Sequence, residues 1–114
     1  MAKDDYYVIV GKILVYLYAR FKDIEKKEPS DYLIPMSKEF PISKDYFNRA
    51  VAEMEKHGYI EVNITRAWGG DIVSVDIDNM VITQEGIDYL RENSGIRKAL
   101  ELIPMAAKVF ELFQ

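Results

Sequence analysis

The centre of the chain reads Ile42-Ser-Lys-Asp-Tyr-Phe-Asn-Arg-Ala-Val-Ala-Glu-Met-Glu-Lys-His-Gly-Tyr-Ile60. Ser43 can cap a helix, because its hydroxyl can accept a backbone N–H of the first turn. Gly58 can adopt the left-handed conformation that ends a helix, and strand-forming residues follow from Tyr59 to Thr65. The stretch therefore predicts a helix that passes directly into a strand, as the second helix of a helix-turn-helix passes into a β-wing. Four apolar residues share one face of this helix and are expected to be buried, namely Phe47, Ala50, Val51 and Met54.

The opposite face of this helix is polar and is compatible with two interpretations. Asn48 and Arg49 are residue types that read adenine and guanine edges through paired hydrogen bonds, and such a face enters the major groove in a helix-turn-helix. The same face could equally be an ordinary solvated helix surface, and Asp45 and Glu53 would repel phosphate. The residues leave both interpretations open. Under the first, the candidate DNA contacts on the helix are Lys44, Asn48, Arg49 and Lys56.

The segment before this helix begins with a long apolar run. Tyr6 to Phe21 is too long for one typical strand, and its apolar side chains surround the helix axis, so we expect a helix that is buried on most sides. Between this run and Ser43 we expect a helical continuation over Lys22–Glu28, a loop over Glu28–Asp31, a short strand at Tyr32–Ile34 and at most one helical turn over Ser37–Phe40.

The residues after the first strand predict a hairpin and then helices. Ala67–Asp71 is a hairpin tip, with Gly69 and Gly70 free to take positive φ, and Ile72–Ile77 is the returning strand. Thr83 is a good N-cap for a helix that runs to Asn93. We expect Ser94 and Gly95 to close this helix, a last helix to start near Ile96, and Pro104 to kink or split it.

Trp68 is the most suggestive single residue, because the predicted hairpin tip gives it little to pack against. Together with Arg66 it is a candidate for contact with a DNA groove, a nucleobase or a partner protein. The alternative is that the indole folds back on its own hairpin, and we favour the contact.

Apolar residues on the first and last helices exceed what one surface helix of a monomer requires. We therefore expect these two helices to form a homodimer. A small effector pocket between the same helices is left open. The dimer-interface candidates are Tyr16, Leu102, Met105, Val109 and Leu112.

Composition limits the classes of function. The 114 residues suit one domain. The formal net charge of −4 argues against tight, sequence-independent DNA binding, because proteins that bind DNA in this way are usually basic.

No nucleotide-binding loop or nucleophile motif occurs, and the single His57 is better explained by the helix dipole than by catalysis. We expect that the protein is not an enzyme and that it has no cofactor site, no metal site and no membrane span. We also expect a cytoplasmic location.

Three stretches resemble the YjcQ-like family of small bacterial and phage winged-helix proteins. They are Phe47-Asn-Arg-Ala-Val-Ala-Glu-Met-Glu-Lys-His-Gly-Tyr-Ile60, Ile82-Thr-Gln-Glu-Gly-Ile-Asp-Tyr-Leu-Arg-Glu-Asn93, and the opening Met1-Ala-Lys-Asp-Asp with its long helix. The first two also resemble winged-helix regulators in general. The chain departs from the family in its longer linker around Lys26 to Tyr32 and in Pro104. The resemblance implies a fold and supplies no catalytic residue.

The sequence therefore predicts an α+β fold, mainly α, consisting of one winged helix-turn-helix domain over residues 1–114. Its helix-turn-helix spans about 37–57, its two- to three-stranded wing about 59–77, and its two C-terminal helices about 83–113. The first functional hypothesis is a regulator-like protein that binds double-stranded DNA. The second is an interaction module that kept the fold but binds a protein, in a prophage setting.

Overall fold

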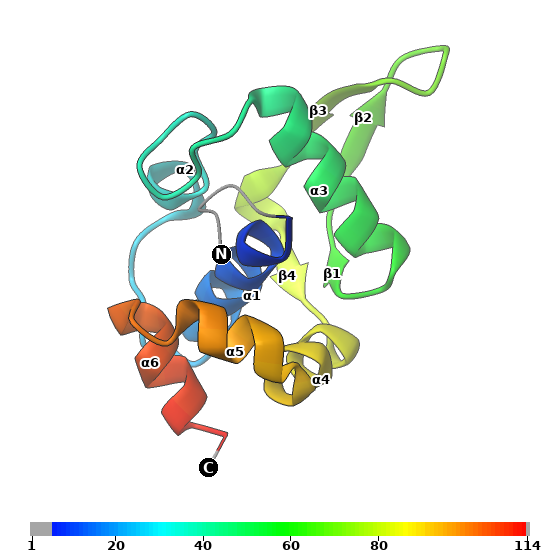
Figure 1. Ribbon diagram of the computed structural model, residues 1–114. Helices are drawn as coiled ribbons and strands as arrows, with labels where there is room; N and C mark the ends of the chain where they lie inside the picture. Colours follow the sequence, from blue (N-terminus) through cyan, green and yellow to red (C-terminus); the bar gives the residue numbers. More distant parts are fainter. Residues whose placement is uncertain (1–5, 114) are drawn as a thin grey trace.

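Helix α1 (Tyr6–Phe21) runs through the middle of the molecule, and most other elements pack around it (Figure 1). It contacts α3, α4, α5, α6 and β4. Ten of its sixteen residues are buried, which confirms the predicted helix with few exposed sides. Val and Ile ordinarily favour strands, but burial on nearly every side stabilises the helix here. The computed structural model describes residues 6–113, so Met1–Asp5 of the family resemblance lies outside the described residues.

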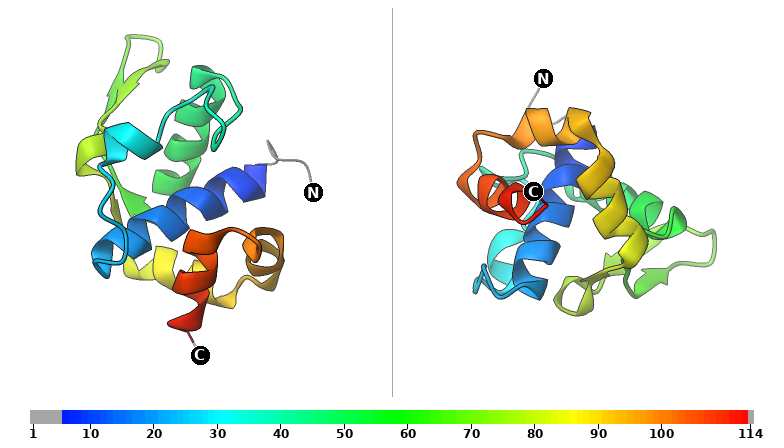
Figure 2. Two further views of the ribbon diagram at one scale, coloured as in Figure 1. Left: turned by 90° about the vertical axis from the view of Figure 1, so that its left-hand side faces the viewer. Right: turned by 90° about the horizontal axis from the view of Figure 1, so that it is seen from below.

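The elements define an α+β fold with a winged-helix-like arrangement. Helix α3 and the hairpin β2–β3 lie on one side of α1, whereas α4, α5 and α6 lie on the other (Figures 1 and 2). The elements that follow α1 in the chain are α2 (Pro29–Tyr32), α3 (Lys44–Lys56), β1 (Ile60–Glu61), β2 (Ile64–Arg66), β3 (Ile72–Val75), the 3-10 helix η1 (Ile77–Asn79), β4 (Val81–Ile82), α4 (Gln84–Glu92), α5 (Ser94–Leu100) and α6 (Pro104–Glu111).

The helix-to-strand junction at the centre of the chain is confirmed in detail. The Ser43 hydroxyl accepts the backbone N–H of Tyr46 at 3.1 Å and caps α3. Gly58 follows the helix with φ +80°, a conformation that side chains with a Cβ adopt only at a cost. The four predicted core residues of α3 are all buried, namely Phe47, Ala50, Val51 and Met54.

The strand expected over Tyr59–Thr65 is interrupted, and its two halves pair with different partners. β1 pairs antiparallel with β4, with Ile60 opposite Ile82. β2 pairs antiparallel with β3, with Ile64 opposite Val75. The chain therefore changes neighbours between the two pairs, so that only β2–β3 projects as a hairpin beside α3 (Figure 1).

The connection between α1 and α3 differs from the prediction. The helix does not continue over Lys22–Glu28, because Asp23 takes φ +60° and the chain turns back so that Ile24 N–H bonds Ala19 C=O at 2.8 Å. The expected loop and strand at residues 28–34 are replaced by α2. Pro29 occupies its first turn, a position where a missing N–H costs nothing.

The helical turn expected over Ser37–Phe40 does not form either. The Ser37 hydroxyl accepts the Phe40 N–H at 3.1 Å, which is a cap-like bond, but the segment consists of turns and bends. Met36 has φ +60°, and its N–H bonds Ile42 C=O at 2.9 Å, so the segment closes on itself. The helix that precedes α3 in the chain is therefore α2.

The C-terminal helices follow the prediction except at one junction. Thr83 caps α4 by accepting the Gly86 N–H at 3.0 Å, and Pro104 separates α5 from α6. Ser94 and Gly95 do not close α4. They form the first turn of α5, because the Asn93 side chain accepts the Ile96 N–H at 3.0 Å and caps the next helix.

Candidate nucleic-acid interface

The outward face of α3 is the first wall of the candidate interface. Lys44, Arg49 and Lys56 are exposed along it. Arg49 Nε donates to the Asp45 carbonyl one turn earlier at 3.4 Å, which keeps this guanidinium along the helix surface. The face therefore presents cations, and the carboxylates of the same helix lie among them.

The β2–β3 hairpin is the second wall, and its own backbone holds the tip in shape. Ala67 N–H bonds Asp71 C=O at 2.8 Å, and Gly70 N–H bonds Ala67 C=O at 2.9 Å. Gly70 takes φ +91°, which is the freedom expected of the pair Gly69–Gly70. Arg66 donates to the Gly70 carbonyl at 3.1 Å, so its guanidinium stays at the base of the tip.

Trp68 is fully exposed at this tip. The indole therefore does not pack on the hairpin, and the folded-back alternative is wrong. Burying an indole provides a large favourable contact area, and its N–H can donate one hydrogen bond. An indole that makes no such contact within the chain is available to a binding partner.

A groove of about 1140 Å³ lies between α3 and the hairpin. Three of the predicted DNA-contact cations line it, namely Arg49 and Lys56 from α3 and Arg66 from β2. Four carboxylates line it as well, so the groove is close to electrically balanced. They are Asp45, Glu53, Glu55 and Asp71.

Asn48 also lines this groove, but only 7% of its surface is exposed. The prediction that Asn48 is exposed on the polar face of the helix, where it could contact DNA bases, is wrong. Strand β3 packs along α3, and Ile72 of that strand lines the same groove. The amide is therefore largely covered by the protein itself. Lys44 does not line the groove and lies free of it at the start of α3.

Two of the predicted dimer contacts belong to the interior instead. Tyr16 and Val109 are fully buried, and their assignment to a dimer interface is therefore wrong. Tyr16 stacks on Tyr32 of α2, and Val109 belongs to α6, which packs directly against α1. Leu102 is 92% exposed, Leu112 is 44% exposed, and Met105 is half-buried. The exposed apolar surface at this end of the molecule thus lies on the α5–α6 turn and the end of α6.

His57 has a structural environment at the end of α3. Its Nε2 lies 3.7 Å from the Glu53 carboxylate one turn earlier. Its ring stacks on Tyr59 with centroids 5.7 Å apart, and Tyr59 stacks on Tyr89 of α4 at 4.4 Å. These ring contacts join the end of α3 to α4.

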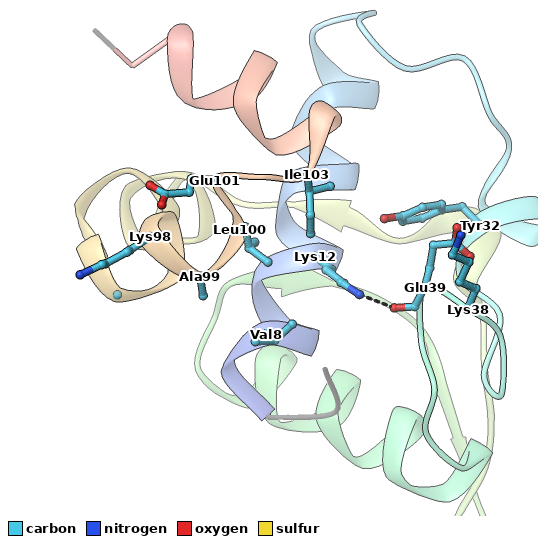
Figure 3. Close-up of a pocket in the computed structure, with 11 residues that line it drawn as sticks. Val8, Lys12, Tyr32, Lys38, Glu39, Lys98, Ala99, Leu100, Glu101 and Ile103 are labelled. Carbon is cyan, nitrogen blue, oxygen red and sulfur yellow. Dashed lines mark hydrogen bonds between the residues drawn. The ribbon is translucent and has the colours of Figure 1, made fainter. Parts of the chain in front are cut away.

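One group of residues was not assigned by the sequence motifs. Lys12 and Tyr32 line a second cleft between α1, the α5–α6 turn and the segment before α3 (Figure 3). The available signal was a lysine inside an otherwise apolar helical run, since a charge on a buried helix generally has a specific partner. Tyr32 carried no such signal, because the sequence placed it in a short strand, whereas the structure places it at the end of α2.

The arrangement of α1, α3 and the hairpin defines an α+β chain of winged-helix-like architecture. Residues 12–108 match the family model described as YjcQ protein, and the chain belongs to the YjcQ family. No curated protein and no solved structure matches the chain. Within residues 6–113, no helix has both the length and the apolar character needed to cross a membrane.

Proposed function

We propose that this protein is a regulator-like DNA-binding protein that contacts duplex DNA through α3 and the β2–β3 hairpin. The observation that supports this most strongly is that Arg49, Lys56 and Arg66, from two different elements, line one groove. A recognition helix and a wing contact the major groove and the adjacent backbone in this way. The hairpin tip, with the exposed Trp68, then reaches the neighbouring minor groove or backbone.

The charge balance of the groove sets what kind of binding is expected. Three phosphate contacts would give a slope of about −3 in log K against log salt. Such a weak electrostatic attraction requires additional contacts to bases for useful affinity. The proposal therefore concerns specific sites and not general coating of DNA.

Selection from a pool of random duplexes at low salt tests the proposal. The expected result is an enriched sequence whose affinity falls when Arg49→Gln or Lys56→Gln is introduced, with the salt slope reduced by about 0.9 for each lost phosphate contact. Lys108→Gln in α6 is the matched control, because this exposed lysine lies on the other side of α1. No enrichment and no salt-dependent retention would remove the DNA proposal.

The second candidate function is a protein-interaction module. The fully exposed Trp68 favours it, since a buried indole is a frequent anchor of protein interfaces. The four groove carboxylates would then face a basic partner. Glu55→Gln discriminates between the two functions. Removing this exposed carboxylate should strengthen DNA binding by reducing phosphate repulsion, whereas it should weaken binding to a basic protein.

We further propose that the protein is a homodimer through the apolar surface that includes Leu102, Met105 and Leu112. Leu102 is nearly fully exposed, so Leu102→Asp should leave the fold of the monomer intact while placing a charge in the interface. Light scattering at micromolar concentration should give a dimer mass for the natural protein and a monomer mass for the variant. A monomer mass for the natural protein would contradict the dimer.

A further inference from the structure

A cleft of about 770 Å³ lies between α1, the α5–α6 turn and the segment before α3. Figure 3 shows its wall of hydrocarbon side chains, with Val8 on α1, Leu100 at the end of α5 and Ile103 in the turn before α6. The volume falls within the range of small-molecule sites, which combine mostly apolar walls with a few placed polar groups. The cleft is therefore large enough for a ligand of several carbon atoms.

Lys12 supplies a positive charge inside this cleft. Its Nζ donates to the Glu39 carbonyl at 2.7 Å and lies 5.9 Å from the centre of the Phe40 ring. These contacts hold the ammonium between α1 and the segment that leads to α3. The side chain of Lys98 also belongs to the cleft lining, but it points away from Lys12 (Figure 3).

Tyr32 directs its hydroxyl into the cleft from the opposite side (Figure 3). Its ring stacks on Tyr16 with centroids 4.7 Å apart and meets Phe40 edge-on at 5.4 Å, so the phenol has a fixed position. Burial raises the pKa of Tyr32 to about 12. The hydroxyl therefore keeps its proton at neutral pH and can donate it in a hydrogen bond.

We propose that this cleft binds a small monocarboxylic acid with an apolar body. The carboxylate would lie between the Lys12 ammonium and the Tyr32 hydroxyl, and the hydrocarbon would cover Val8, Leu100 and Ile103. A carboxylate accepts hydrogen bonds from both donors, and its bond to an ammonium is among the stronger ones. Within residues 6–113, three basic and two acidic residues line the cleft. This small excess of positive charge suits a single negative charge better than a phosphate.

Methyl-group NMR spectra of the full chain, titrated with octanoate below its micelle concentration, test the proposal. The expected result is saturable shifts of the Val8, Leu100 and Ile103 methyl signals. Octanamide is the matched neutral probe, because it keeps the hydrocarbon and loses the charge. It should bind at least tenfold more weakly. Absence of saturable shifts with octanoate, or equal binding of octanamide, would overturn the proposal.

Three variants locate the carboxylate. Tyr32→Phe keeps the stacked ring and removes only the hydroxyl, and it should weaken octanoate binding about tenfold, as expected for one hydrogen bond to a charged group. Lys12→Met keeps the length of the side chain and should weaken binding at least as much. Lys108→Met, at an exposed lysine of α6 outside the cleft lining, should bind as the natural protein does.

Octanoate affinities of Tyr32→Phe and Lys12→Met equal to that of the natural protein would overturn this site. Tyr32→Phe is informative even if Lys12→Met does not fold, because its ring contacts persist. All these measurements use the protein without DNA. Their outcome is therefore distinguishable from failure of the proposed DNA binding.

Discussion

Gly86 shows how a single residue permits the contact between two helical units. A Cβ at this position would lie 2.2 Å from the Tyr59 carbonyl oxygen and 2.9 Å from Ile82 Cγ1. The oxygen belongs to the backbone and cannot rotate away, so α4 would have to move from the end of α3. We expect Gly86→Ala to lower the free energy of unfolding by roughly 2–3 kcal/mol, measured by urea denaturation.

Gly69→Ala is the control for this prediction. A Cβ at Gly69 meets no heavy atom within 4 Å, and its φ lies outside the left-handed region. The change should therefore stay within about 0.5 kcal/mol. Equal effects of the two substitutions would show that the close approach of Gly86 to Tyr59 does not constrain the fold.

Trp68 can report its own environment, because it is the only tryptophan in the chain. Since its side chain is fully exposed, the native protein should fluoresce at the wavelength of an indole in water. Unfolding in urea should shift that wavelength little. A bound partner that covers the tip should shift the emission to the blue. A blue-shifted emission of the free protein would contradict the exposed tip.

At the scale of elements, the two helix caps differ in what they connect. The Ser43 hydroxyl makes a bond within its own helix, to Tyr46 N–H. The Thr83 hydroxyl accepts from Gly86 N–H in α4 and also donates to the Gly58 carbonyl, just after α3. Thr83 therefore joins two elements that are distant in the sequence, and its loss should cost more.

We expect Ser43→Ala to cost about 1 kcal/mol of stability, the usual value for an N-cap. Thr83→Ala should cost about 2 kcal/mol, because the partly buried Gly58 carbonyl loses its partner as well. Urea denaturation of both variants measures the difference. Equal costs would mean that the bond to Gly58 contributes nothing to the packing of α4 on α3.

At the scale of the whole molecule, Tyr16 and Tyr32 make stability depend on alkaline pH. Burial raises the pKa of each to about 12, above the ordinary value of 10.0. The folded protein therefore retains protons that the unfolded chain loses. The contribution to stability is fully present below pH 10 and is lost as the pH rises from 10 towards 12.

Phenolate absorbance and circular dichroism, followed together from pH 8 to pH 12, test this prediction. Tyr16 and Tyr32 should ionise together with unfolding. The double variant Tyr16→Phe/Tyr32→Phe should lose less stability between pH 10 and pH 12. Ionisation of every tyrosine near pH 10 with the helical signal intact would contradict it. Tyr7→Phe is the control, because Tyr7 is exposed.

Local signals explain why much of the fold was predictable. The Ser43 cap, the apolar spacing from Phe47 to Met54 and the positive φ of Gly58 depend on neighbours within a few residues. The same holds for Thr83 as a cap and for Pro104 as a break between helices. The exposure of Trp68 followed from its place between glycines and a polar strand end.

The failed predictions about which side chains lie at the surface concern contacts between segments that are distant in the sequence. Asn48 is covered because β3 packs along α3, and Val109 is buried because α6 packs on α1. Tyr16 is buried where Tyr32 of α2 stacks on it. Helical spacing tells which residues share a face, but not what covers that face. The helix at α2 was missed because its few residues carry no apolar period.

The order of residues by itself determined the caps, the breaks and the helix that passes into a strand, since each follows from backbone chemistry over a few positions. Tertiary structure alone decided which faces remain open. It brought cations of α3 and β2 into one groove, and placed Lys12 of α1 near Tyr32 of α2. Segments far apart in the chain meet only when the core packs, because burial of apolar area sets their positions.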